Sequence, residues 1–282
     1  MHYEMLPQDE LINRLEQVCR EDERLLAAMH YGSLARGEGD VYSDLDIMLF
    51  FADEAAAEID QRAWLSQIST VELFYVNEFG NSVAIFDNLV RGEFHFDPAG
   101  EMAKLAEYGD RVRYPALETT VLVDKNGRLA EHLAALIGPP LIHESAGEAR
   151  YLGDSFLNWF LFGFNMLSRG EYARALEIMA LIHDNLLRMA RIEEGRTGRW
   201  ISPTKALEKD ISPAAYRRFQ DCTAALDRAA LQIAYQAGWD WGNEMLVDLG
   251  RRYELDLPAG LIVKIGERLD RYAVDPGALK AV

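Results

Sequence analysis

The pattern of apolar and polar positions divides the chain into two parts of different character. Up to residue 123, short apolar runs and strict alternation recur, as is typical of β-strands. Helical spacing, with apolar residues three and four apart, predicts two helices in the same part, over residues 8–21 and 54–66. We expect strands over residues 25–31, 44–51, 70–76, 82–86, 92–97 and 119–123.

Strand patterns end at Pro139-Pro140, and only helical patterns follow. The predicted helices span residues 145–169, 171–195, 214–237, 239–252 and 259–272. We therefore predict an α/β (α+β) domain in residues 1–140, with a mixed β-sheet and helices on one side of it. An all-helical bundle domain is expected in residues 141–282.

Composition and charge narrow the classes of partner. The chain has 282 residues, of which 49% are apolar, so two packed cores are possible. Its formal net charge of −17 repels nucleic acid backbones, and this disfavours a polymerase or a tRNA-modifying enzyme. We expect no nucleic acid partner and favour a neutral or cationic small molecule.

The cysteines and the apolar segments bear on location. Cys19 and Cys222 are too few for a disulfide framework or a zinc site, and both lie in helical patterns, so buried free thiols are expected. The N-terminal segment lacks the apolar run of a signal peptide. Residues 155–167 are apolar but too few to cross a bilayer. We expect a cytoplasmic protein with no membrane segment.

The candidate chemistry lies between the first two predicted strands. Asp44 and Asp46 are two residues apart at the start of a strand, so their carboxylates point to the same side. Two carboxylates this close repel each other and favour a bound cation. Oxygen ligands of this kind suit Mg²⁺, which takes one or two carboxylates together with substrate phosphates.

Gly32-Ser33 lies ten residues upstream of this acidic pair, at the end of a strand. Glycine permits close approach of the backbone, and a helix beginning here would offer its free N–H groups to an anion. A phosphate cradle beside a metal-binding pair is what nucleotidyl transfer requires. An isolated Asp-x-Asp pair is more often a solvated edge or turn, but the ordered combination favours a functional site.

The stretch from Tyr31 to Ile47, YGSLARGEGDVYSDLDI, resembles the polymerase-beta-like nucleotidyltransferase superfamily. That family has an apolar strand, Gly-Ser or Gly-Gly, about ten residues, then Asp-x-Asp or Asp-x-Glu. The resemblance implies that Asp44 and Asp46 hold Mg²⁺ and that the Gly-Ser turn contacts a nucleoside triphosphate. The predicted nucleotide-binding residues are Gly32, Ser33, Arg36 and, in the helical part, Lys205.

The same family has a third carboxylate on a neighbouring strand, and Glu93 is the candidate. Alternation in RGEFHFD places Glu93, His95 and Asp97 on one face and two Phe residues on the other. A carboxylate facing the metals could accept the proton of an acceptor hydroxyl as general base. Three alternatives stay open: Glu93 faces solvent, Glu93 is first a metal ligand, or Asp87 takes its place.

At closer range the chain resembles the longer, two-domain lincosamide nucleotidyltransferases. The likeness lies in YGSLARGEGD, RGEFHF, WFLFGFNM (159–166) and ISPTKALEKDIS (201–212). It implies an adenylyltransferase that moves AMP from ATP, or a monophosphate from another NTP, to a hydroxyl of a lincosamide antibiotic. Alternatives are an aminoglycoside acceptor, a protein acceptor, and a nucleotide-binding regulatory module without turnover.

Two further expectations concern the helical part. Residues 188–218 hold eight Lys or Arg against four Asp or Glu, and the family resemblance makes Lys205 a phosphate contact. The alternative is a solvated run of charges paired with Glu208 and Asp210. A homodimer is expected from the resemblance and from the aromatic-rich helix at residues 156–164, whereas His183 is expected to be structural.

Overall fold

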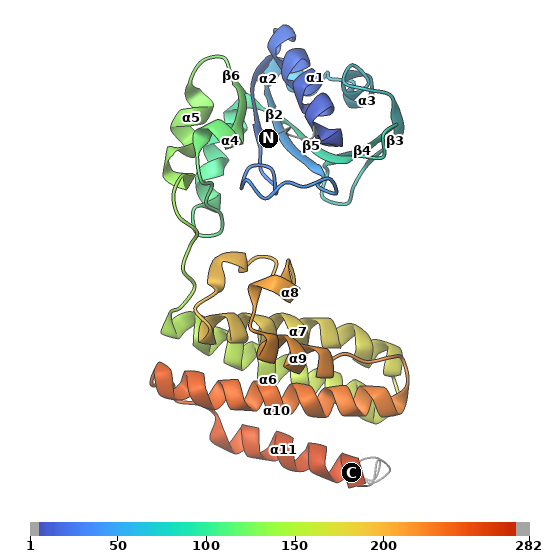
Figure 1. Cartoon of the computed structure of the whole chain (residues 1–282), viewed down its shortest axis with the longest axis vertical. Coiled ribbons are helices and arrows are strands. Elements are labelled where there is room, and N and C mark those ends of the chain that lie inside the picture. The colour runs from blue at the N-terminus through green and yellow to red at the C-terminus, as the bar shows by residue number, and fades with distance from the viewer. Residues whose placement is uncertain (1–5, 275–282) are drawn as a thin grey trace. The chain divides into compact units, whose positions relative to one another are not determined.

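The structure, a computed structural model, describes residues 6–274. The chain divides into two compact units, Met1–Leu141 and Ile142–Val282 (Figure 1). Each unit has its own hydrophobic core, because the buried apolar clusters of the first unit lie within residues 11–136 and that of the second within residues 149–272. Each unit is described below by itself.

The first unit is built on a six-stranded sheet with strand order β3-β4-β5-β2-β1-β6. Every neighbouring pair is antiparallel except β2 and β5, which are parallel. The mixed sheet predicted from the sequence is therefore confirmed. The strands are β1 (Leu25–His30), β2 (Leu45–Phe51), β3 (Val71–Val76), β4 (Ser82–Phe86), β5 (Arg91–Pro98) and β6 (Val121–Asp124).

Helices cover both faces of this sheet, so the expectation of helices on one side was wrong. Trp64 of α3 belongs to the buried cluster on one face, and Met102 of η1 belongs to the separate cluster on the other. The reason is visible in β1, where successive apolar residues bury both faces of the strand. The helices are α1 (Pro7–Glu21), α2 (Asp53–Ala56), α3 (Gln61–Leu65), η1 (Ala99–Tyr108), α4 (Leu117–Thr120), α5 (Arg128–Leu133) and η2 (Ala134–Leu136).

Two predicted elements of this unit differ from the structure. The single helix expected over residues 54–66 is interrupted, because the Asp60 side chain accepts a hydrogen bond from the Ala63 N–H at 3.0 Å and starts a new helix. The strand expected over 119–123 begins only at Val121, after the helical turn α4. In α4 the Thr120 hydroxyl bonds the Ala116 carbonyl oxygen at 2.8 Å.

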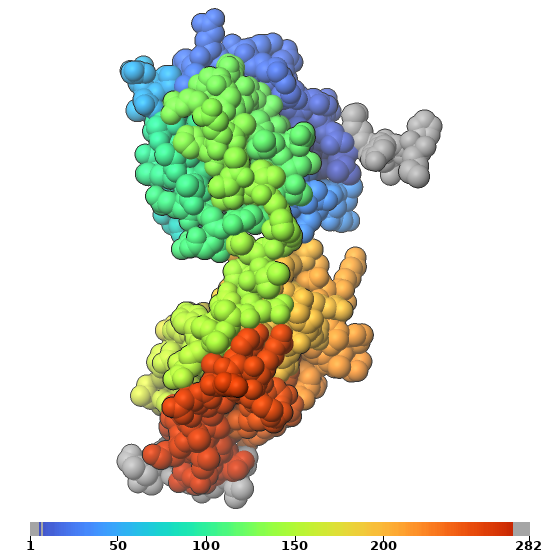
Figure 2. Space-filling view, turned by 90° about the vertical axis from the view of Figure 1, so that its left-hand side faces the viewer, coloured from blue at the N-terminus to red at the C-terminus, as the bar shows by residue number. Residues whose placement is uncertain are grey.

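In the second unit, every element described within residues 142–274 is a helix, which confirms the predicted helical bundle. The long pair α6–α7 begins at a capping box between Ser145 and Glu148 and turns at Gly170, which has a left-handed backbone. Figure 2 shows α11 on the surface of the unit, where it packs against α6 and α10. The helices are α6 (Ala146–Arg169), α7 (Tyr172–Glu193), η3 (Thr197–Arg199), α8 (Leu207–Asp210), α9 (Pro213–Asp221), α10 (Arg228–Arg252) and α11 (Ala259–Val274).

The break between two helices that the sequence predicted at residue 238 was wrong, because the structure has this break earlier in the chain. α9 ends at Asp221, and α10 runs from Arg228 through Gly238 without interruption. Asp227 marks the true start, because its side chain accepts a hydrogen bond from the Ala230 N–H at 3.0 Å. A glycine inside a helix is tolerated at a cost of about 1 kcal/mol, so Gly238 did not need to end the helix.

The aromatic run of α6 lies mainly within its own unit. Phe156, Phe160 and Phe164 are fully buried, and Phe160 contacts Tyr235 and Trp239 of α10. These side chains therefore offer little surface to a second copy, and the homodimer stays a prediction based on resemblance.

The predicted buried free thiols are confirmed, since Cys19 and Cys222 are both buried and unpaired. Burial raises the pKa of each thiol to about 12. Among the described residues, no helix has both the length and the apolar character needed to span a bilayer.

Candidate active site

Parallel pairing of β2 and β5 brings two of the predicted acidic residues together. Asp46 lies directly opposite Glu93 in the register of this pair, so both side chains leave the sheet on the same face. Asp44 lies just before β2, two residues before Asp46 in the sequence. The sheet therefore collects the three candidate carboxylates at the starting ends of two adjacent strands.

Alternation along β5 has the consequence predicted from the sequence. Phe94 is fully buried in the apolar core between the sheet and α1. Glu93 faces the opposite side, and 22% of its side chain is exposed. The burial of Phe94 thus fixes the direction in which Glu93 points.

The Gly32 backbone passes directly over Asp46. The Tyr31 N–H donates to the backbone oxygen of Asp46 at 3.0 Å, which holds the end of β1 against β2. A Cβ atom at position 32 would lie 1.5 Å from Asp46 Oδ2, so no larger residue can occupy this position without displacing the carboxylate. Close approach of backbone is the role expected of a glycine here.

The helix expected to begin at Gly32-Ser33 does not form, and the chain instead makes consecutive turns. The Ser33 carbonyl oxygen accepts from the backbone N–H groups of Arg36 (3.1 Å) and Glu38 (3.0 Å). Gly37 has a φ of +68°, which is incompatible with a continuing helix. Arg36 is exposed, with its Nε 3.4 Å from Glu38 Oε2.

Arg91 is the main site residue that the sequence predictions missed. Its guanidinium bridges two carboxylates, with Nη1 2.7 Å from Asp44 Oδ2 and Nη2 3.1 Å from Glu93 Oε2. The signal was present, because a residue two positions before Glu93 on a strand shares its face. Arg91 supplies the positive charge between these carboxylates.

Glu93 has further partners on its other oxygen. Asn81 donates to Glu93 Oε1 at 2.9 Å, and the Tyr31 hydroxyl donates to the same oxygen at 3.4 Å. The Tyr31 ring meets His95 edge-on, with ring centroids 5.2 Å apart. Asn81 comes from the turn between β3 and β4, and no pattern in the sequence indicates that this turn reaches Glu93.

Electrostatics distinguish the carboxylates. Burial, and then the charges of Asp44 and Glu93, raise the pKa of Asp46. Burial alone would also raise the pKa of Glu93, but hydrogen bonds from Asn81 and Arg91 outweigh it and leave that pKa below its usual value. Glu93 is therefore stabilised as a carboxylate, whereas for Asp46 the charges of Arg91 and Arg36 only partly offset the rise in pKa.

The donor set fits a hard divalent cation. Carboxylate oxygens are the ligands Mg²⁺ prefers, and a cation near Asp46 would relieve the repulsion that raises its pKa. The Arg91 guanidinium already occupies a cationic position between Asp44 and Glu93. Within residues 6–274, no three His, Cys, Asp or Glu side chains are arranged to hold a metal ion as they stand. Residues that could hold one are Asp44 and Asp46, with Glu93 beside them.

The two alternative carboxylates, Asp87 and Asp97, do not lie opposite Asp46. Asp87 is exposed in the turn before β5, where it accepts a hydrogen bond from the Ser69 hydroxyl at 3.0 Å. Asp97 lies opposite Phe50 near the far end of β5. Glu93 is thus the β5 carboxylate aligned with Asp46.

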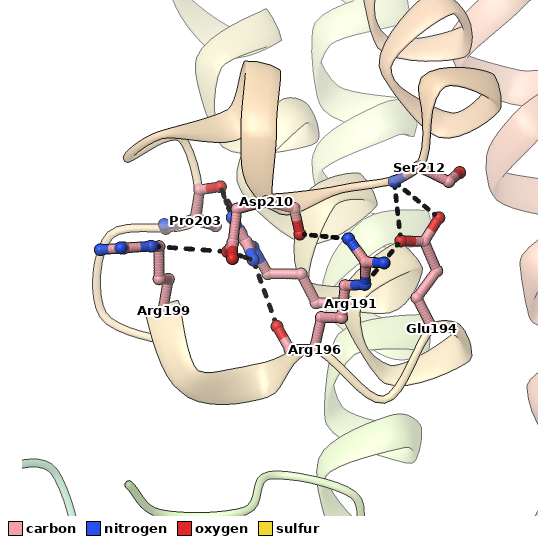
Figure 3. A network of polar contacts seen from close by, with 7 residues as sticks. All are labelled: Arg191, Glu194, Arg196, Arg199, Pro203, Asp210 and Ser212. Atoms are coloured by element: carbon pink, nitrogen blue, oxygen red, sulfur yellow. Dashed lines mark hydrogen bonds and ion pairs between the residues drawn. The ribbon is translucent and has the colours of Figure 1, made fainter.

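The basic segment of the helical unit is organised around a buried arginine (Figure 3). Arg191 is fully buried and donates to the carbonyl oxygen of Pro203 at 2.9 Å and of Arg196 at 3.2 Å. It also forms an ion pair with Asp210 at 2.5 Å. Part of the local positive charge therefore has a structural role. Asp210 is paired, as one alternative predicted, but its partner Arg191 is buried and not solvated.

Lys205 lies in the same segment, in a unit separate from the acidic residues. Its backbone N–H donates to the Ser202 carbonyl oxygen at 2.9 Å, and its side chain is half-buried. Ala206 follows with a φ of +51°, an unusual conformation for a residue other than glycine. His183 is structural as expected, since its Nε2 lies 2.8 Å from the Cys222 carbonyl oxygen.

Comparison with known families identifies the helical unit. Residues 146–268 match the family described as lincosamide nucleotidyltransferase-like, C-terminal domain. No curated protein matches the sequence. The predicted resemblance to lincosamide nucleotidyltransferases is therefore confirmed for residues 146–268, the part of the chain that is similar to this domain.

Two solved structures are similar at low identity. An aminoglycoside 6-adenyltransferase from Bacillus subtilis is 15% identical, with 93% of this chain and 97% of that chain covered and a TM-score of 0.43. A nucleotidyltransferase-like protein from Exiguobacterium sibiricum 255-15 is 16% identical, with 92% and 91% covered and a TM-score of 0.33.

Proposed function

We propose that the chain, whose residues 146–268 match a lincosamide nucleotidyltransferase-like C-terminal domain, is a nucleotidyltransferase that inactivates a lincosamide antibiotic by adenylylation. The donor is ATP, the metal is Mg²⁺, and the acceptor is a hydroxyl group of the antibiotic. The observation that carries the proposal is the alignment of Asp46 with Glu93 beneath the Gly32 turn.

In this proposal the acidic residues have two different roles, metal binding and proton transfer. Asp44 and Asp46 would hold Mg²⁺, which when bound neutralises the phosphate oxygens and orients the reacting groups. Glu93, kept ionised by Asn81 and Arg91, would take the proton of the acceptor hydroxyl. The hydroxyl oxygen then bonds to the α-phosphorus of ATP, the bond to the β-phosphate oxygen breaks, and pyrophosphate leaves.

In the first unit, three residues are proposed to contact the nucleotide. Gly32 and Ser33 offer backbone groups at a turn, and Arg36 adds an exposed positive charge beside it. Lys205, the phosphate contact that the resemblance implies, lies in a basic segment of the helical unit whose backbone is fixed by Arg191. Its role, like those of Gly32, Ser33 and Arg36, stays a prediction.

The decisive experiment is a transfer assay with a matched pair of variants. The protein is incubated with each NTP, Mg²⁺ and a panel of antibiotics, and nucleoside monophosphate adducts are sought by mass spectrometry. Asp46→Asn should abolish transfer, whereas Asp87→Asn, which changes an exposed carboxylate of the same sheet, should not. Near-normal turnover of Asp46→Asn would remove Asp46 from the site.

An aminoglycoside is the second candidate acceptor. The net charge of −17 attracts polycationic compounds, and aminoglycosides carry several amino groups. The same panel separates the candidates, because the adduct forms on one class of antibiotic and not on the other. Nucleotide binding without any adduct would instead support a regulatory module.

A further inference from the structure

The Arg91 guanidinium lies between two carboxylates of the candidate site. Its two terminal nitrogens contact one carboxylate each, Asp44 at 2.7 Å and Glu93 at 3.1 Å. Glu93 belongs to β5 and Asp44 precedes β2, so the guanidinium ties β5 to the segment that leads into β2. Arginine is suited to this because its planar fork can engage two acceptors at once.

A divalent cation and this guanidinium are both attracted to the charge of Asp44. Arg91 contacts only one oxygen of that carboxylate, Oδ2, so a metal could share the carboxylate with it, but the charge of Asp44 is already partly neutralised. The cation would also meet repulsion from the positive charge of Arg91. Asp46 is different, because none of its described contacts is an ion pair with Arg91.

We propose that Arg91 is an internal counter-ion of Asp44 and Glu93, and that its positive charge weakens the binding of a divalent cation between Asp44 and Asp46. This inference rests on the proposed function, because it takes Asp44 and Asp46 to be the metal ligands. Arg91 is a positioning residue in this role, since it arranges the carboxylates without entering the reaction. Its presence makes the site bind free cations weakly, and it keeps the carboxylates together until a cation arrives.

The test measures Mn²⁺ binding to the full chain without nucleotide, by electron paramagnetic resonance of the free ion. Arg91→Gln removes the competing charge and should bind Mn²⁺ about tenfold more tightly, as expected for the loss of two partly exposed ion pairs. Arg91→Lys keeps the charge but loses the fork, so its affinity should lie between the two. The difference between wild type and Arg91→Gln should shrink as salt is added.

A second measurement, the thermal stability of the variants, tests the proposal without relying on Mn²⁺ affinity. Without metal, Arg91→Gln should unfold at a lower temperature than wild type, because Asp44 and Glu93 lose their counter-ion, and Mn²⁺ should restore more of its stability. Arg24→Gln is the matched control, since Arg24 pairs with Asp22 elsewhere in the same unit. Its affinity for Mn²⁺ should equal that of wild type.

The outcomes separate this inference from the proposed function. Equal Mn²⁺ affinity in wild type and Arg91→Gln, with Asp46→Asn weakened, would overturn the role of Arg91 and leave the metal site in place. Affinity that is unchanged in Asp46→Asn would overturn the metal site itself, and with it the inference.

Discussion

Asp46 is a half-buried carboxylate whose pKa is raised by burial first and by Asp44 and Glu93 second. Its ionised form therefore destabilises the folded state. This penalty is absent below the ordinary carboxyl pKa of 3.8 and is complete once the pH exceeds the raised pKa. The charge that the reaction is proposed to use is thus unfavourable for folding in the absence of metal.

We expect Asp46→Asn to be more heat-stable than wild type at pH 7 in EDTA. The amide has nearly the same shape but no charge, so the repulsion from the neighbouring carboxylates is lost. Near pH 3 the difference should vanish, because Asp46 is then protonated in both folded and unfolded chains. Circular dichroism melting at the two pH values checks this, and a lower melting temperature at pH 7 would contradict it.

Gly32 controls the position of the same carboxylate. In Gly32→Ala the new Cβ would have to displace Asp46 Oδ2, which lies 1.5 Å from the Cβ position. Because a shift of about 1 Å can cost on the order of a hundredfold in rate, turnover should fall by about that factor with the fold retained. Gly100→Ala is the control, since its Cβ would make only ordinary contacts at 3.5 Å. Equal turnover in both variants would refute the assignment.

Glu93→Gln separates a base from a metal ligand. The variant keeps the shape of the side chain and removes its basicity, so turnover should fall at least about a hundredfold while ATP affinity changes little. Single-turnover kinetics and calorimetric ATP titration measure the two quantities. Collapse of ATP and Mg²⁺ binding would make Glu93 a ligand first. No change in either would move the search for the base to Asp87 and Asp97.

Residue patterns predicted some parts of this region and not others. Strand periodicity was enough to direct Glu93 away from the core, because Phe94 is apolar and fills it. The same rule places Arg91 on the face of Glu93, but periodicity alone does not show that its guanidinium also reaches Asp44. Asn81 was beyond reach, since its contact depends on how a turn between two other strands folds back.

At the scale of elements, the segment between α7 and α9 is held by a network of polar contacts that includes the ion pair of Arg191 with Asp210 (Figure 3). Asp210→Ala would leave the fully buried guanidinium of Arg191 without its carboxylate. We expect a loss of about 3 kcal/mol in the free energy of unfolding, the lower end for a buried pair because Asp210 is partly solvated. Urea denaturation measures it. Asp154→Ala, which breaks the exposed pair with Arg150, should cost at most about 1 kcal/mol, and equal losses would contradict the prediction.

Elements with strong periodicity were predicted well, and their interruptions were not. β4 and α6 have nearly the expected bounds, because a short apolar run marks the first in the sequence and a capping box marks the start of the second. The breaks before Gln61 and Arg228 depend on single aspartates, Asp60 and Asp227, whose side chains bond backbone N–H groups. A capping aspartate looks in the sequence like any other polar residue within a helical pattern.

At the scale of the whole molecule, we propose that each unit is an independently folding domain. Residues 142–282 expressed alone should give a helical circular dichroism spectrum and a single cooperative unfolding transition, because their core is complete within the unit. The sheet unit, residues 1–141, should likewise retain its fold. An isolated helical unit that lacks a cooperative transition would show that the domains depend on each other.

Separate cores also affect how such a chain can change over generations. A core substitution in one unit reduces the stability of that unit. Its change in unfolding free energy is additive with the changes caused by distant substitutions in the other unit. Each part therefore has its own threshold below which mutations are removed by selection. Lineages can alter the surface of the helical part, and recombination can exchange it, while the sheet that aligns Asp46 with Glu93 is inherited unchanged.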